Sequence, residues 1–235
     1  MTETLISDDP ATACAERLVR AAAAGGHIVI TGGSTPQAAY EQAAAMDADW
    51  SGATIWFSDE RCVPPDDEKS NYRMAKAALF DRLPPPGEGG PTVHRMRGES
   101  GPSAGADDYE RELREVVGEQ VPRLDFILLG LGPDAHVASI FPGKPAVQVH
   151  DRAAVGVEEA GHEPFVPRIT LTLPVLNAGR EVVFLVSGED KAEAVARAFG
   201  GEPTPDAPSS LVRPTDGTLT LLLDEAAAGG LRPRP

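Results

Sequence analysis

The sequence predicts an α/β fold in which a mostly parallel β-sheet is flanked by helices. Short apolar runs with strand character alternate with helical segments, which is typical of βαβ units. Glycine, proline or charged residues follow these runs where turns are expected. The 235 residues show no internal repeat and no long linker, and they suffice for a sizeable core. We therefore expect a single domain over residues 1–235, with its core at about 11–228.

The N-terminal half alternates good helix formers with β-branched runs, and glycine or proline marks the boundaries. In chain order this pattern predicts a helix at 11–24, a strand at 27–31, a helix at 37–45 opened by Pro36, a strand at 54–58, a helix at 71–83, a loop at 84–91 and a charged helix at 106–118.

The C-terminal half continues the alternation with more strongly apolar strands. The expected elements are a buried strand at 124–129 followed by a turn and a helix, a weak strand at 153–157, an alternating strand at 168–173, a central strand at 181–187, a helix at 191–199, a loop at 200–210, a strand at 219–223 and a helix at 225–228.

Composition narrows the choice of partners. A formal net charge of -15 argues against nucleic acid or an anionic membrane as the main partner, although a local basic pocket can still bind an anionic small molecule. Two cysteines provide no disulfide framework and favour a reducing compartment. Residues 1–9 lack a basic leader segment, and the apolar run 21–24 is too short to span a bilayer. We expect a soluble cytoplasmic protein that is a monomer or a weak homo-oligomer.

Polar or glycine-rich segments follow four of the predicted strands, at residues 32–35, 59–61, 130–136 and 187–191. In an open α/β sheet, ligands bind beyond the carboxyl ends of the strands. These four segments are therefore expected to meet at one edge of the sheet and to form a ligand site there.

The turn Gly32-Gly33-Ser34-Thr35-Pro36 places small residues between a strand and a helix N-terminus. Glycines let the backbone approach an anion, and free amides and hydroxyls can bind it. The turn matches neither a Walker loop nor GxGxxG, and Pro36 breaks the GxSxG pattern, which makes Ser34 a poor candidate nucleophile. An ordinary capped tight turn is the alternative interpretation.

Charged residues lie beside three other predicted elements, one of which is the strand at 168–173 that begins at Arg168. Asp59-Glu60-Arg61 follows a strand, where such a triplet is commonly a solvated loop, yet Arg61 could bind a phosphate in bidentate fashion. Lys191 opens a helix, and a cation at that end favours an anionic partner, although Glu189 and Asp190 could simply offset it.

Residues 128–142 form the segment that most specifically indicates a catalytic centre. An apolar strand runs into Gly130 and Gly132, and Asp134 and His136 follow at once. A carboxylate two residues from an imidazole can orient the ring and suits a general base. Asp134 could instead cap a helix and His136 could be structural. No third ligand lies at metal-binding spacing, and Ser139 lacks a nucleophile elbow.

Several motifs in the same order resemble the 6-phosphogluconolactonase family. Residues 32–36 match GGSTP, 58–61 match SDER, Asn71 and Tyr72 match a downstream Asn-Tyr pair, 130–143 match GxGxDGHxASLFPG, 168–170 match R-[IV]-T, and 187–192 match xxSGxxKA.

The resemblance implies a Rossmann-like sheet of the sugar-phosphate isomerase/lactonase type and hydrolysis of a sugar-phosphate lactone without metal or cofactor. It implies His136 as the general base with Asp134 beside it. The implied substrate and phosphate contacts are Gly32, Gly33, Ser34, Thr35, Asp59, Arg61, Arg168 and Lys191.

Two points qualify the resemblance. The family usually has glycine at the position of Ala135, and if that position needs a positive φ, alanine costs roughly 1 kcal/mol. The related glucosamine-6-phosphate deaminases carry a ring-opening glutamate where this chain has Phe141, which cannot relay protons. A deaminase-like enzyme and a sugar-phosphate sensor are the alternatives, although this acidic chain shows no basic helix-turn-helix segment.

Overall fold

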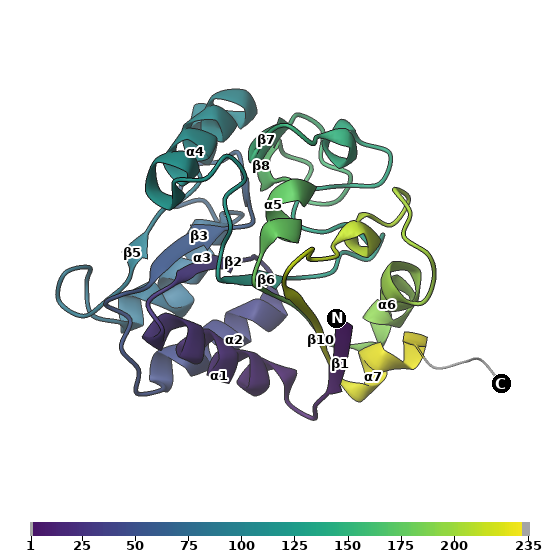
Figure 1. Ribbon diagram of the computed structural model, residues 1–235, viewed down its shortest axis with the longest axis horizontal. Coiled ribbons are helices and arrows are strands. Elements are labelled where there is room, and N and C mark those ends of the chain that lie inside the picture. Colours follow the sequence, from purple (N-terminus) through teal and green to yellow (C-terminus); the bar gives the residue numbers. More distant parts are fainter. Residues whose placement is uncertain (1, 232–235) are drawn as a thin grey trace.

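The computed structural model describes residues 2–231, and within this range seven parallel strands form the central sheet (Figure 1). In spatial order the strands are β1 (Thr2–Ile6), β10 (Thr218–Leu223), β9 (Glu181–Val186), β6 (Phe126–Leu129), β2 (His27–Ile30), β3 (Thr54–Phe57) and β5 (Thr92–Val93). The predicted mostly parallel sheet is confirmed.

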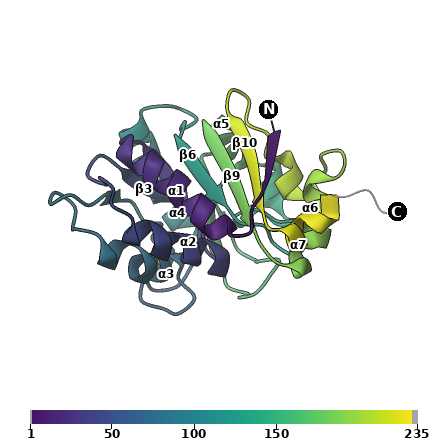
Figure 2. The same cartoon turned by 90° about the horizontal axis from the view of Figure 1, so that it is seen from below.

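Helices cover the sheet, and Figure 2 shows α1 and α2 lying across one of its faces. The helices are α1 (Pro10–Ala23), α2 (Ser34–Ala45), α3 (Asn71–Ala78), α4 (Pro102–Val117), α5 (Leu173–Ala178), α6 (Ala192–Phe199) and α7 (Glu225–Ala228). In residues 2–231 no helix is both long and apolar enough to cross a lipid bilayer.

The core lies on the middle strands of the sheet. All four residues of β6 are buried, as are five of the six in β9, because neighbouring strands and packed layers cover them on every side. Strand β1 at the edge of the sheet is mostly exposed and pairs with β10. It precedes residue 11, where the core was predicted to begin. Its polar, short sequence gives little periodic signal, which is why sequence patterns did not reveal it.

A second sheet in the described chain has three antiparallel strands, β4 (Asp59–Arg61), β8 (Arg168–Leu171) and β7 (Ala154–Val157). Helix α4 packs against β7 and β8 (Figure 1). The expectation that 59–61 is a solvated loop is wrong, because β4 pairs with β8 and buries Asp59 and Glu60 at 5% and 3% exposure.

Several helix boundaries differ from the predicted ones. Helix α3 ends at Ala78 and is followed by a separate 3₁₀ turn at Phe80–Arg82, where a continuous helix to residue 83 was predicted. Helix α4 begins four residues early, at Pro102, whose fixed φ suits the first helical position after Gly101. The stretch after β6 was predicted to turn into a helix, and this prediction is wrong. Residues 130–144 instead form consecutive turns that contain an isolated bridge between Val137 and Ile140.

Candidate active site

A cavity of about 280 Å³ opens at the carboxyl ends of β2, β6 and β9, beside the second sheet. Every residue predicted for the site lines it except Asp134, which lies behind the His136 ring as a hydrogen-bond partner. The predicted residues that line the cavity are Gly32, Gly33, Ser34, Thr35, Asp59, Arg61, His136, Arg168 and Lys191. The sheet edge thus gathers all four polar segments, as expected for this topology.

The turn after β2 forms one wall of the cavity. Helix α2 begins at Ser34, two residues before the predicted start at Pro36, and Gly33 caps it with a φ of 114°. A side chain at that angle is strained. A Cβ on Gly32 would come within 2.1 Å of Asn71 Oδ1. The two glycines therefore let the chain turn tightly and bring the N-terminal amides of α2 to the cavity, where they favour an anion.

Glu60 ties β4 to the start of α3. Its carboxylate accepts hydrogen bonds from the backbone N–H groups of Arg61 (2.7 Å), Asn71 (2.7 Å) and Tyr72 (2.8 Å) and from the hydroxyl of Ser70 (3.0 Å). Burial raises the pKa of Glu60, although these hydrogen bonds act in the opposite direction. Glu60 thereby fixes the strand on which Asp59 and Arg61 stand.

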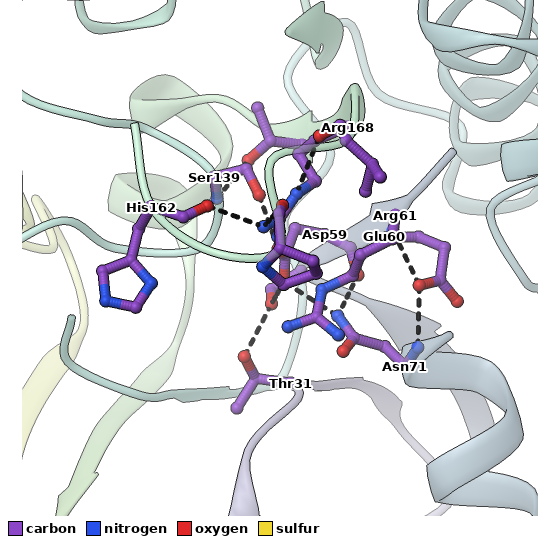
Figure 3. Close-up of polar contacts among 12 residues, drawn as sticks. Thr31, Asp59, Glu60, Arg61, Asn71, Ser139, His162 and Arg168 are labelled. Atoms are coloured by element: carbon purple, nitrogen blue, oxygen red, sulfur yellow. Dashed lines mark hydrogen bonds and ion pairs between the residues drawn. The ribbon is translucent and has the colours of Figure 1, made fainter. Parts of the chain in front are cut away.

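Asp59 lies at the centre of a buried polar network (Figure 3). Its Oδ2 accepts a hydrogen bond from Ser139 Oγ at 2.6 Å and lies 3.9 Å from Arg168 Nη1. Asn71 Nδ2 donates to the backbone carbonyl of Asp59 at 3.0 Å. Because the Ser139 hydroxyl points at a carboxylate and pairs with no histidine, the geometry gives Ser139 a structural contact and no nucleophilic role.

Arg61 and Lys191 bring cationic groups to the cavity. Arg61 Nη1 donates to the Lys69 carbonyl at 2.5 Å, while its Nε is buried without a hydrogen-bond partner. Lys191 Nζ donates to the Leu131 carbonyl at 3.0 Å, and an ammonium has two further protons to offer. An unpaired buried donor is unfavourable, so Arg61 is set up to gain from an anionic ligand.

Most donors of the Arg168 guanidinium form hydrogen bonds within the protein, which the sequence pattern did not predict. Its guanidinium donates to the carbonyls of Val166 (3.2 Å), Pro164 (2.8 Å) and His162 (3.3 Å). Burial lowers the pKa of Arg168, and the charge of Asp59 opposes that effect. Arg168 therefore holds the loop at 162–166, of which His162 and Glu163 line the cavity, and its Nη1, on the side of Asp59, is the group left to contact a ligand.

His136 and Asp134 form a close pair. His136 Nδ1 lies 2.5 Å from Asp134 Oδ1, and the same oxygen accepts the backbone N–H of His136 at 3.1 Å. Burial pushes the pKa of Asp134 upward, but the hydrogen bonds and charge of His136 outweigh it and lower the pKa below its ordinary value. With Nδ1 engaged, Nε2 is the ring nitrogen free to exchange a proton. The imidazole packs on Phe141, with ring centroids 4.6 Å apart.

The turn that carries this pair has left-handed backbone. Ala135 has a φ of 63° and Ala138 a φ of 49°. Ala135 thus occupies the conformation that glycine adopts freely, and alanine there costs roughly 1 kcal/mol. Because no helix follows, the alternative of Asp134 as a helix cap is wrong.

His162 lines the cavity, although the sequence pattern predicted no role for it. Its ring centroid lies 5.7 Å from that of His136, and its Nδ1 lies 3.0 Å from the Glu163 carbonyl. Asn71 and Glu163 also line the cavity. His162 stands in a loop without periodic pattern, and hydrogen bonds of Arg168 to carbonyls of that loop help to hold it at the site, so no local sequence signal could have identified it.

Comparison with known proteins shows which sequences and structures this chain is similar to. Residues 3–221 match the family described as glucosamine-6-phosphate isomerases/6-phosphogluconolactonase. A 6-phosphogluconolactonase of Streptomyces coelicolor is 42% identical over 217 residues, covering 87% of this chain and 81% of that protein. One from Synechocystis is 38% identical over 213 residues, covering 88% and 85%. The structure of 6-phosphogluconolactonase from Trypanosoma cruzi superposes with a TM-score of 0.84 at 27% identity, covering 97% of this chain and 96% of that one. The chain belongs to the family of glucosamine-6-phosphate isomerases and 6-phosphogluconolactonases.

Proposed function

We propose that this protein hydrolyses 6-phospho-D-glucono-1,5-lactone to 6-phospho-D-gluconate, the lactonase step of the oxidative pentose phosphate pathway. The observation that carries the proposal is the His136–Asp134 pair, with 2.5 Å between Nδ1 and Oδ1, in a cavity that also holds Arg61, Arg168 and Lys191. A base beside several cations suits attack of water on an ester of a phosphorylated sugar.

In the proposed reaction His136 Nε2 takes a proton from water as the water oxygen attacks C1 of the lactone. Asp134 holds the imidazole in the required orientation and stabilises its protonated form. When the tetrahedral intermediate collapses, the bond between C1 and the ring oxygen breaks, and His136 returns the proton to that oxygen. The products are a carboxylic acid, which ionises, and a hydroxyl. A lactone is reactive enough for general-base catalysis, which typically supplies about 10²–10⁴-fold.

The phosphate lies at the other end of the substrate and serves to position C1. The N-terminal amides of α2 and the hydroxyls of Ser34 and Thr35 form one half of the proposed phosphate site. Lys191 and Arg61 form the other half, because each retains donors that the protein leaves unused. Binding energy from this remote group then favours the reactive geometry at C1.

Phe141 argues against deamination in this cavity. Its side chain is buried, its ring packs on the imidazole of His136 with 4.6 Å between centroids, and the Arg168 guanidinium carbon lies 6.0 Å from its centroid. An apolar ring cannot move protons to or from an opening sugar ring. The position thus supports hydrolysis over isomerisation.

Regarding its setting, we propose a cytoplasmic enzyme that acts on a small-molecule lactone as a monomer or weak homo-oligomer, without nucleic acid or membrane as a partner. Both cysteines, Cys14 and Cys62, are free, which fits a reducing compartment.

The test is the rate of acid release from freshly prepared 6-phosphogluconolactone, measured by a coupled assay above spontaneous hydrolysis. We expect saturable turnover that does not occur with glucosamine 6-phosphate as substrate. A rate indistinguishable from the spontaneous one would contradict the proposal. Ammonia release from glucosamine 6-phosphate would instead identify a deaminase.

A further inference from the structure

Ser209 contacts the turn that carries His136 from a distant part of the chain. It belongs to a short 3₁₀ turn, Pro208–Leu211, and is fully buried at 0% exposure. Its backbone N–H donates to the Ala135 carbonyl at 3.0 Å. Its hydroxyl lies 2.7 Å from the same carbonyl and 3.1 Å from the carbonyl of His136, so one proton is shared between two acceptors.

The turn needs such support because it is neither helix nor sheet. Within it, Ala135 N–H donates to the Gly132 carbonyl at 2.9 Å, and Gly132 N–H donates to the His136 carbonyl at 3.0 Å. These bonds leave Ala135 in a left-handed conformation that alanine disfavours. The contacts of Ser209 fall on the carbonyls of the strained residue and of His136, where they oppose relaxation toward ordinary backbone angles.

We infer that Ser209 is a positioning residue for His136, acting through the backbone of residues 135–136; the inference rests on the proposed hydrolysis. Ser209 does not line the cavity, so it touches no substrate. Its effect is to hold the imidazole where Nδ1 meets Asp134 and Nε2 meets the attacking water. A shift confined to residues 135–136 would weaken the base, whereas the proposed phosphate contacts at the start of α2, Arg61 and Lys191 stand on other segments.

The neighbouring serine provides a matched control. Ser210 is also buried, at 2% exposure, and lies in the same 3₁₀ turn. Its hydroxyl accepts from Thr204 N–H at 2.8 Å and donates to the Thr204 carbonyl at 3.2 Å, away from residues 135–136. Ser209→Ala and Ser210→Ala therefore remove the same hydroxyl group from adjacent buried positions. Only Ser209→Ala removes hydrogen bonds to the carbonyls of residues 135–136.

The experiment measures kcat and KM for the phosphorylated lactone in both variants and in Ser209→Ala combined with Ala135→Gly. We expect Ser209→Ala to lower kcat about five- to ten-fold with KM unchanged, the loss typical of buried hydrogen bonds. Ser210→Ala should keep the wild-type kcat. The added Ala135→Gly should restore part of the lost kcat, because glycine adopts the left-handed angle without support. Equal kcat in the two single variants, or a change in KM alone, would overturn the inference.

A second readout does not depend on turnover. In the wild-type protein, the proton between His136 Nδ1 and Asp134 should give a low-field NMR resonance, and Ser209→Ala should shift or broaden it while Ser210→Ala leaves it in place. If the wild-type protein fails to hydrolyse the lactone, the proposed function fails, and this resonance alone decides the positioning role: an unchanged signal in Ser209→Ala refutes it. If Ser209→Ala does not fold, Ser209→Cys, which keeps a weaker donor of similar size, replaces it in both measurements.

Discussion

Gly132 lies directly against the imidazole of His136: a Cβ on Gly132 would come within 2.0 Å of Nδ1. The glycine is therefore required by contact with a side chain, in addition to any demand of the turn. Substitution by alanine would force the ring away from Asp134. We expect Gly132→Ala to lower kcat strongly while the thermal midpoint changes little. Gly201→Ala, where a Cβ meets open space, is the control and should behave as wild type in the lactone assay.

His136→Ala tests the base directly. We expect kcat to fall about 10²–10⁴-fold, the usual contribution of general-base catalysis, with the far-UV circular dichroism spectrum unchanged. His150, which is exposed and outside the cavity, provides the control substitution His150→Ala. Near-wild-type turnover in His136→Ala would refute the assignment of the base.

Lys191→Ala tests the phosphate site. Losing a charged donor should raise KM for the phosphorylated lactone about ten- to a hundred-fold and leave hydrolysis of unphosphorylated gluconolactone almost unaffected. Arg197→Ala is the control, because Arg197 lies on α6 and donates to the Asp206 carbonyl outside the cavity. The same loss with both lactones would show that Lys191 acts on the turn at Leu131 and not on the phosphate.

Ala135→Gly should stabilise the protein or leave its stability unchanged, whereas alanine-to-glycine changes in helices destabilise. Relief of the left-handed strain is worth roughly 1 kcal/mol, and the extra freedom of glycine in the unfolded chain offsets part of it. The comparison is Ala196→Gly inside α6, which should lose up to about 1 kcal/mol. Urea unfolding measures both, and an equal loss in the two variants would contradict the strain at Ala135.

Asp134 predicts a pH dependence of stability. Its pKa in the folded protein lies below the ordinary value of 3.8, so the folded state binds that proton less readily than the unfolded chain. The stabilisation is present above the ordinary pKa and is lost as the pH falls through the lower folded value. Between pH 6 and pH 3 the free energy of unfolding should therefore fall less in Asp134→Asn than in the wild type. Parallel curves would show that the carboxylate gains nothing from His136.

Much of the fold was predictable because it follows from local pattern. Apolar runs such as those of β6 and β9 predict buried parallel strands. The glycine-containing turns that follow these strands predict a ligand site at the carboxyl edge of the sheet, and the cavity lies there. The prediction failed for 59–61, because those charged residues become a buried strand only through pairing with β8, more than a hundred positions away.

Site residues that lie in one short stretch of sequence were predictable, whereas those that the fold brings in from distant segments were not. Residues 130–136 contain the glycines, the carboxylate and the imidazole within seven positions, and in the structure they lie close to the predicted cations. Their catalytic roles stay predictions. His162 and Ser209 reach the site from loops whose sequences show no periodicity, through hydrogen bonds to Arg168 and to the turn at Ala135. Such contacts depend on the tertiary fold and leave no local signature.

The position of β1 has a practical consequence. Its mostly exposed residues cover the edge of β10, whose leucines are buried, and its backbone satisfies the hydrogen-bonding groups along that edge. A chain shortened by its first six residues would present an apolar strand with unpaired amides and carbonyls, a template for edge-to-edge aggregation. Recombinant versions should therefore keep Thr2–Ile6 intact, and an N-terminal fusion should be joined through a flexible spacer.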